Sequence, residues 1–290
     1  MNATQNLRIL SQIFSPPMFQ KIVREGDVAL FQKQTTKYLN LTDNNYTNLD
    51  IIKLLYKMLQ KKYRCEYIYK NHLFLNIIKE YGLTKTLTIN EFKISSSKAD
   101  LLLLNGSARV FEIKTELDDF SKLSKQLEDY QKFADFVFIV TNEKNGVKLS
   151  VEYANTNIGI IIFNGQNKLE MLKEAGSNVA LFDFDTIFKL LRKQEYLDLV
   201  ADNFGVIPAV PNTKIFRACY EELATIDIIK FQQQVINKLK ERKLLNPSLL
   251  RSRKTPKELK YICNSLNFNE QEYHSLYNFL KEGNQCISHM

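Results

Sequence analysis

Two acidic residues and a lysine stand inside the predominantly apolar strands of the stretch KADLLLLNGSARVFEIK at residues 98–114. They are Asp100, Glu112 and Lys114. Side chains two apart on a strand share a face, so Glu112 and Lys114 should project to the same side, roughly 6 to 7 Å apart. An unpaired buried charge costs several kcal/mol. Charged residues in strands otherwise suited to burial therefore indicate chemistry rather than packing.

The turn between these two strands decides whether Asp100 joins the pair. A two-residue turn at Asn105 and Gly106 would place Asp100 opposite Phe111, on the wrong face. An odd-numbered loop, such as a three-residue turn ending in a left-handed glycine, reverses the parity. We expect the odd loop or an equivalent bulge, and hence Asp100 on the face of Glu112.

Two carboxylates and an ammonium at one end of a sheet suit a divalent cation. Mg²⁺ prefers oxygen ligands and retains waters, so carboxylates and a main-chain carbonyl form a site open to a substrate phosphate. A lysine beside the metal-bound water favours hydroxide and offsets negative charge in the transition state. The ordinary alternative is a surface ion pair of Glu112 and Lys114 on an edge strand, worth under about 1 kcal/mol.

Hydrophobic periodicity predicts the elements that position these residues. They are a helix at 66–81, strands near 86–94, 99–104 and 109–114, a helix at 119–134 and a strand at 136–141. The segments 157–164 and 168–172 add a later hairpin. This order predicts a mixed α/β core with a crossover connection.

Helical regions are expected on both sides of the core. We divide the chain into an N-terminal helical region at 1–65, a core at 66–176 and a C-terminal helical region at 177–290. The segment GVIPAVPNTK at 205–214 is the best linker candidate, because two prolines and a glycine interrupt a periodic run.

Composition excludes several classes of protein. The longest apolar run, residues 158–163, is too short to span a bilayer, and the N-terminus does not have the pattern of a secretory signal. The four cysteines are widely scattered and form no CxxC pair: Cys65, Cys219, Cys263 and Cys286. We therefore expect a reduced, cytoplasmic protein.

The net charge of +8 is concentrated in the segment 230–260, where ten basic residues stand against two acidic ones. The remainder of the chain is neutral, so this segment is expected to attract a phosphate backbone. The residues assigned to that contact are Lys238, Lys240, Arg242, Lys243, Arg251, Arg253 and Lys254. The alternative is a solvated helix face.

The residues quoted above resemble a known family. KAD at 98–100 and FEIK at 111–114, across a short hairpin, resemble the PD-(D/E)xK nuclease superfamily, whose restriction-endonuclease-like core has the order αβββαβ. The next helix carries QLEDY, so Gln126 and Tyr130 match the QxxxY motif of RecB-like and related branches. The sequence EIKTELDDFSKLSKQLEDY at residues 112–130 is similar to that of an uncharacterised bacterial branch with this core. Ala99 departs from the proline in the family name.

The resemblance covers about residues 66–150 and implies roles for the matching positions. It implies that Asp100 and Glu112 hold Mg²⁺, with Mn²⁺ as an alternative, and that the Ile113 carbonyl assists. It implies that Lys114 orients the nucleophile.

The resemblance also implies that Gln126 and Tyr130 flank the active site or touch the phosphate. The alternative is that they border the core stripe of their helix. Many members use a glutamate on the first helix, for which Glu66 is the candidate and Glu80 the second choice. The more common explanation of such a glutamate is an acid that complements the helix dipole.

The sequence thus predicts a Mg²⁺-dependent nuclease that hydrolyses phosphodiester bonds, with DNA as the favoured substrate. The competing hypothesis is a catalytically inactive nuclease-fold protein that binds nucleic acid or another protein. The sequence leaves open a homo-oligomer or a partner protein, although cutting both strands at once needs two active sites. It does not distinguish DNA from RNA or endonuclease from exonuclease.

Overall fold

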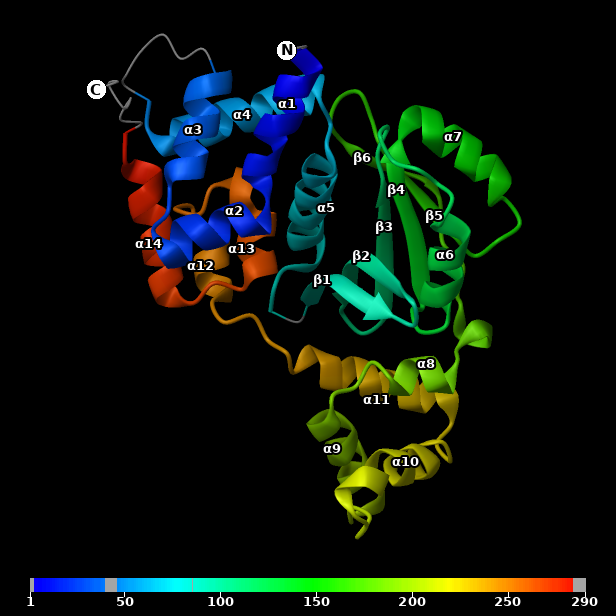
Figure 1. Ribbon diagram of the computed structural model, residues 1–290. Helices are drawn as coiled ribbons and strands as arrows, with labels where there is room; N and C mark the ends of the chain where they lie inside the picture. The colour runs from blue at the N-terminus through cyan, green and yellow to red at the C-terminus, as the bar shows by residue number, and fades with distance from the viewer. Residues whose placement is uncertain (1–2, 40–45, 85, 284–290) are drawn as a thin grey trace.

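A six-stranded mixed sheet forms the centre of the computed structural model, which describes residues 3–39, 46–84 and 86–283 (Figure 1). The strands are β1 (Leu87–Ile94), β2 (Ser97–Leu104), β3 (Ala108–Lys114), β4 (Phe136–Asn142), β5 (Gly159–Phe163) and β6 (Leu169–Lys173), and they lie in this order. The pairs β1–β2, β2–β3 and β5–β6 are antiparallel, whereas β3–β4 and β4–β5 are parallel. The predicted mixed α/β fold is confirmed.

Helices cover both faces of the sheet. Alternate residues of β2 face opposite sides: Leu101 and Leu103 share a hydrophobic cluster with α5 (Glu66–Tyr81), while Leu102 and Leu104 share another with α6 (Leu123–Gln131). The order α5, β1, β2, β3, α6, β4 reproduces the predicted αβββαβ sequence of elements.

The helix α6 begins later than predicted, at Leu123 instead of residue 119. The backbone before it is held in turns by short polar side chains: Asp118 accepts from the Thr115 N–H at 2.7 Å, and Asp119 accepts from the Ser121 N–H at 3.0 Å. Such local bonds compete with helix formation.

One core helix escaped prediction, α7 (Glu143–Glu152), which connects β4 to β5. Its sequence, EKNGVKLSVE, is polar and contains Gly146 in the middle. A Cβ at this glycine would stand 2.3 Å from Cγ2 of Ile162, so the glycine permits the helix to lie close on β5. The tertiary contact therefore outweighs the low helix propensity of glycine.

The remaining helices flank the core. They are α1 (Ala3–Ser11), α2 (Pro16–Gln20), α3 (Ala29–Tyr38), α4 (Asn48–Lys62), α8 (Phe184–Phe188), α9 (Lys193–Phe204), α10 (Asn212–Leu223), α11 (Ile228–Lys240), α12 (Pro247–Arg251), α13 (Lys260–Leu266) and α14 (Glu270–Lys281). Short segments are η1 (Gln12–Phe14), η2 (Lys21–Glu25), η3 (Val179–Leu181) and η4 (Lys257–Leu259). No helix in the described residues is long and apolar enough to cross a membrane. Cys65, Cys219 and Cys263 are free thiols, and Cys286 lies outside the described residues.

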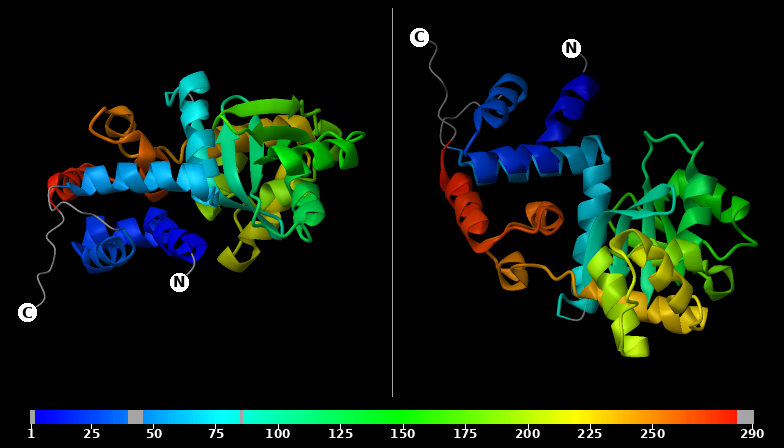
Figure 2. Two further views of the ribbon diagram at one scale, coloured as in Figure 1. Left: turned by 90° about the horizontal axis from the view of Figure 1, so that it is seen from above. Right: turned by 60° about the horizontal axis from the view of Figure 1, so that its bottom comes forward.

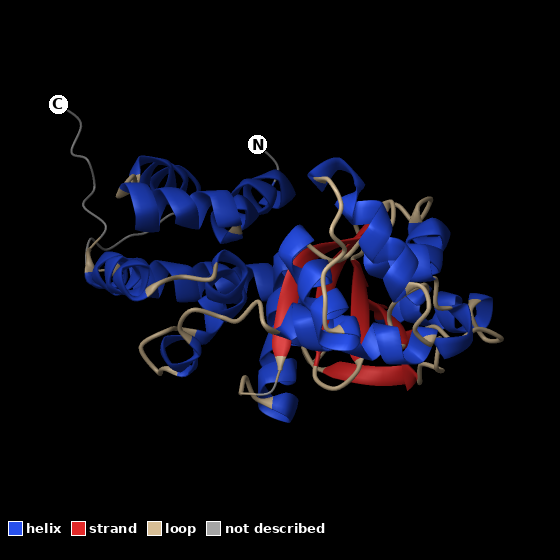
Figure 3. Ribbon diagram, turned by 90° about the horizontal axis from the view of Figure 1, so that it is seen from below, coloured by secondary structure: helices blue, strands red, loops and turns tan. Residues whose placement is uncertain are grey.

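The C-terminal helices form two separate groups. Helices α8 to α11 share a hydrophobic cluster with the α6 face of the sheet, whereas α12 to α14 pack with α1 to α5 (Figures 1 and 2). Seen from below, the α1–α4 and α12–α14 helices form a helical layer beside the sheet (Figure 3). The chain crosses between the two groups at residues 241–246.

The expected linker at 205–214 does not separate two domains. It connects α9 to α10, and these helices pack on each other, with the rings of Tyr196 and Phe216 5.9 Å apart. The prolines and glycine at 205–214 therefore end one helix and precede the next within one helical group. Only the tertiary packing distinguishes such a loop from a boundary.

A close contact between β4 and β5 gives a test of the core. A Cβ at Gly159 would stand 2.4 Å from Cδ1 of Phe138, whose ring stacks on Phe111 at 5.2 Å. Gly159→Ala should lower the free energy of unfolding by about 1 to 3 kcal/mol, because overpacking displaces this ring. Urea denaturation measures the change. Gly165→Ala, with no atom within 4 Å of its new Cβ, is the control, and an equal loss in both variants would contradict the argument.

Candidate active site

The β2–β3 hairpin has the predicted odd parity. Its loop consists of residues 105–107, and continuing the register beyond the Leu101–Phe111 pair brings Asp100 to the level of Glu112. Their side chains contact different helices: Asp100 pairs with Lys70 of α5, whereas Glu112 accepts from Gln126 and Tyr130 of α6. Gly106, at φ +96°, is the second residue of the loop instead of the last. The prediction about the loop length is confirmed, and the position of the left-handed glycine within it differs.

Glu112 lies at the centre of a closed hydrogen-bond network. Its Oε1 accepts from Nε2 of Gln126 at 2.6 Å and lies 3.0 Å from Nζ of Lys114. Its Oε2 accepts from the Tyr130 hydroxyl at 2.8 Å. Lys114 also donates to Oε1 of Gln126 at 3.0 Å. The QxxxY residues of α6 therefore contact both the glutamate and the lysine of β3.

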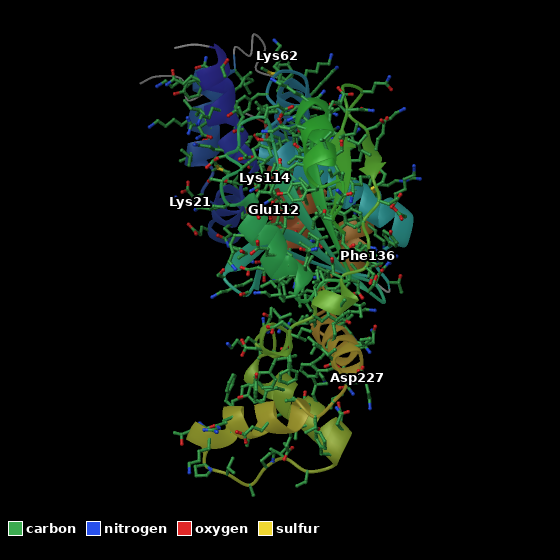
Figure 4. The ribbon with its side chains drawn as sticks, turned by 90° about the vertical axis from the view of Figure 1, so that its right-hand side faces the viewer. Lys21, Lys62, Glu112, Lys114, Phe136 and Asp227 are labelled. Atoms are coloured by element: carbon green, nitrogen blue, oxygen red, sulfur yellow. The ribbon has the colours of Figure 1, made fainter. Side chains whose placement is uncertain are left out.

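These side chains are buried. Glu112 is 2% exposed and Lys114 is 9% exposed, so they are not a surface ion pair. Figure 4 shows both in the middle of the molecule, apart from Phe136 at the start of β4 and from Asp227 in the lower helical group. Burial and the Glu112 carboxylate raise the pKa of Tyr130 well above its usual range, so its hydroxyl remains a donor. Tyr130 also belongs to the α6-side core, as the alternative interpretation of this residue expects.

Asp100 is bound between β3 and α5. Its Oδ2 accepts from the Ile113 N–H at 2.7 Å, and its Oδ1 lies 3.0 Å from Nζ of Lys70. Burial raises the pKa of Asp100 to about 7; Lys70 opposes the shift, while the carboxylates of Glu112 and Glu66 add to it. Asp100 and Glu112 are thus close enough for their charges to interact.

The first helix contributes Glu66, as predicted, and also Lys70. The Lys70 ammonium lies 2.5 Å from Oε1 of Glu66 and 2.7 Å from Oε1 of Glu91. Burial opposes its charge, but Asp100 and the other carboxylates raise the pKa of Lys70 well above its usual range. Lys70 therefore remains an ammonium ion.

Glu80, the second choice on α5, lies elsewhere. It lines a separate cavity of about 520 Å³ together with Arg109 and Phe136. In Figure 4, Phe136 lies away from Glu112, at the opposite end of the sheet. Glu80 is therefore not brought to the Asp100 site.

Sequence reasoning missed Lys70 and Glu91. Lys70 could have been found as the fourth residue after Glu66 on a helix whose neighbouring side chains are apolar. Glu91 stands at the level of Asp100 in the β1–β2 register, but its φ of +54° is rare for a residue other than glycine. Such a backbone conformation at a glutamate has no signal in the sequence.

The donor set suits a hard cation. Carboxylate oxygens of Glu66, Glu91 and Asp100 lie within 4.8 Å of one another. Oxygens bound to one cation at about 2.1 to 2.4 Å can be no more than about 4.2 to 4.8 Å apart, so the spacing fits a single ion. At Glu112, Oε2 has a single hydrogen-bond donor, Tyr130, and retains a lone pair for a metal. Glu66, Glu91 and Asp100 thus have the spacing of a cation site, while the Mg²⁺ that the sequence resemblance implies would take carboxylate oxygens of Asp100 and Glu112.

The basic segment does not form one continuous patch. Lys238 pairs with Asp198 at 3.5 Å and with Glu241 at 3.2 Å, and Arg242 pairs with Glu195 at 2.5 Å. These bonds fix α9 to α11. Because their charges are neutralised within the protein, we no longer assign Lys238 and Arg242 to phosphate binding.

The other basic residues of this segment reach the surface. Lys240, Lys243 and Arg251 line a groove of about 580 Å³ beside the start of β1. Arg253 and Lys254 are exposed just after α12. These five residues remain candidates for backbone contact.

The fold and the site define a mixed α/β protein with a buried centre of carboxylates and lysines. Residues 59–263 match the family described as Bacteriophage P4 protein cII, and the chain belongs to this family. Protein cII of Enterobacteria phage P4 is 27% identical over 171 residues, which are 57% of this chain and 63% of the relative. The match thus spans less than two thirds of that relative's length.

Among solved structures, a protein of unknown function from Silicibacter pomeroyi aligns with 47% of this chain and 90% of its own chain. The sequence identity is 14% and the TM-score is 0.30.

Asp100 gives the metal-free protein a characteristic pH dependence. Its pKa is about 7 in the folded chain and ordinarily 3.8, so between these values the folded state holds a proton that the unfolded state has lost. The free energy of unfolding should therefore fall as the pH rises from about 4 to about 7. Asp100→Asn should remove this part of the fall in urea denaturation with a chelator present.

The control for this experiment is Asp119→Asn, which removes an exposed carboxylate from the loop between β3 and α6. In this control the free energy of unfolding should fall with pH between 4 and 7 as steeply as in the wild type. An equally steep fall in Asp100→Asn would contradict the assignment of the pH dependence to Asp100.

Proposed function

We propose that the chain is a metal-dependent nuclease that hydrolyses phosphodiester bonds, with DNA as the favoured substrate. The observation that carries the proposal is the proximity of Asp100 to the buried Glu112–Lys114 pair: Asp100 accepts from the N–H of Ile113, the residue between them. Gln126 and Tyr130 contact this group from α6. The same five positions carry the resemblance to the PD-(D/E)xK nuclease superfamily.

When bound, a Mg²⁺ or Mn²⁺ ion held by Asp100, Glu112 and the Ile113 carbonyl supplies a polarised water and offsets phosphate charge. Lys114 contributes a fixed ammonium that orients the attacking water and stabilises charge developing on the phosphate. Its position is fixed by two acceptors, Oε1 of Glu112 and Oε1 of Gln126, each 3.0 Å from Nζ.

Gln126 and Tyr130 orient the Glu112 carboxylate. They donate to different oxygens of Glu112, at 2.6 and 2.8 Å, and so fix the plane of the carboxylate group. Preorganised groups of this kind need no rearrangement as the reaction proceeds. We therefore assign both residues to positioning Glu112.

A cleavage assay tests the proposal. Purified protein should nick plasmid DNA with Mg²⁺ and stop when a chelator is added. Asp100→Ala, Glu112→Ala and Lys114→Ala should each lower the rate by about 10²-fold or more, because each removes a metal ligand or the charge at the phosphate. Circular dichroism checks that the variants fold.

Lys122→Ala, at an exposed lysine just before α6, is the matched control and should cleave at the wild-type rate. Activity that survives Lys114→Ala would count against the proposal. DNA affinity without Mg²⁺-dependent cleavage would favour the catalytically inactive nuclease-fold protein instead.

We further propose that the basic groove binds the phosphate backbone. Replacing Lys240, Lys243 and Arg251 by alanine should weaken DNA binding and reduce the slope of log affinity against log salt by up to about 2.7 for duplex DNA. Fluorescence anisotropy at several salt concentrations measures both quantities.

The control variant removes three exposed lysines from another surface. These are Lys144, Lys148 and Lys168. Both triple variants lose the same net charge, so a purely general charge effect would change the slope equally. An equal reduction of the salt slope in the two triple variants would therefore contradict the assignment of the groove to DNA binding.

A further inference from the structure

A buried lysine stands where three carboxylates meet. Lys70 comes from α5, and its partners come from three elements: Glu66 from α5 itself, Glu91 from β1 and Asp100 from β2. The distances from Nζ to their oxygens are 2.5, 2.7 and 3.0 Å. The Lys70 side chain is 8% exposed. We call Glu66, Glu91 and Asp100 the outer carboxylate group.

The outer carboxylate group has the spacing of a cation site. Its oxygens lie within 4.8 Å of one another, as ligands of a single ion must. The Lys70 ammonium contacts one oxygen of each member, so it occupies the position that such an ion would take. In this protein the Lys70 ammonium is the cation at that position.

Asp100 belongs to two groups at once. One oxygen faces the Lys70 ammonium, and the other accepts from the Ile113 N–H next to Glu112. The outer position is therefore filled by Lys70, and the metal of the proposed function would take a separate, inner position at Asp100 and Glu112. Two adjacent positions that share a carboxylate are the arrangement of two-metal sites.

We propose that Lys70 replaces a second divalent ion, so that the active site accepts one metal at the inner position and excludes another from the outer carboxylate group. The inner metal rests on the proposed function, but the exclusion by Lys70 does not. Lys70 is then a positioning residue, because its ammonium holds the carboxylates from α5, β1 and β2 together without entering the reaction.

The charges of the site agree with one metal. Four carboxylates, those of Glu66, Glu91, Asp100 and Glu112, face the two buried ammonium groups of Lys70 and Lys114. Lys98 adds a third cation at 3.1 Å from Glu91 but is 62% exposed. The four carboxylates and two buried ammonium groups leave a charge of −2, which one divalent ion balances. A second divalent ion would make the site positive and would be repelled by the fixed ammonium groups.

Anchoring of α5 keeps Lys70 in place. The neighbouring residue Asn71 is fully buried, accepts from the Tyr261 N–H at 3.0 Å and donates to the Lys257 carbonyl at 3.0 Å. These bonds tie α5 to the segment around α13. The ammonium is thereby held in the outer carboxylate group by the backbone of the helix as well as by its ion pairs.

Counting Mn²⁺ ions tests the proposal without nucleic acid or activity. Free Mn²⁺ is measured by electron paramagnetic resonance during titration of the full chain. Lys70→Met, which keeps the length of the side chain and removes its charge, should bind one more ion than the wild type. The melting temperature of this variant should rise with Mn²⁺ more than that of the wild type, because the ion replaces the lost cation.

Lys98→Met is the matched control, because Lys98 also pairs with Glu91 but from the surface. It should bind the same number of ions as the wild type. Equal numbers in Lys70→Met and the wild type would overturn the proposal, whether that number is none, one or two.

A second variant covers the case in which Lys70→Met does not fold. If Lys70 fills the outer carboxylate group, Glu91 is not a metal ligand, and Glu91→Gln should bind the same number of Mn²⁺ ions as the wild type. One bound ion fewer than in the wild type would overturn the proposal.

The outcomes separate this proposal from the proposed function. A wild type that binds no ion, with one ion gained in Lys70→Met, would support the exclusion by Lys70 and count against the inner metal site. A wild type that cleaves DNA and binds two ions would support the nuclease and overturn the exclusion.

Discussion

The burial of Asp100 and Glu112 is the constraint on which the rest of the structure depends. Ionised carboxylates in an apolar interior are costly unless each is paired and hydrogen-bonded. Glu112 meets this requirement with donors from β3 and α6, and Asp100 with donors from β3 and α5. Both helices that cover the core must therefore reach the same end of the hairpin, and the charges fix where they lie.

The hydrophobic layers complement this polar centre. One cluster joins the α5 face of the sheet to the N-terminal helices and α12 to α14, and the other joins the α6 face to α8 through α11. The chain thus covers the two faces of its sheet with different parts of its C-terminal half. The buried lysines Lys70 and Lys114 approach the carboxylates from α5 and β3, which gives the site two differently held cations.

Local rules predicted much of the core and less of its surroundings. The odd loop of the hairpin was expected from the requirement that Asp100 stand opposite Glu112, and the QxxxY helix was found from its motif. The basic segment was predicted less well, because a count of charges along the chain does not show their partners. Lys238 and Arg242 are neutralised by Asp198 and Glu195, which lie about 40 or more residues earlier.

The sequence by itself determined the αβββαβ order, the odd loop of the hairpin and the pairing of Glu112 with Lys114, because periodicity and turn length are properties of short segments. Only the tertiary structure decided that Lys70 and Glu91 join them. Their contribution depends on how α5 lies against the sheet, on the pairing of β1 with β2 and on a left-handed backbone at a glutamate. Such relations between distant segments arise from packing and are not encoded in any local pattern.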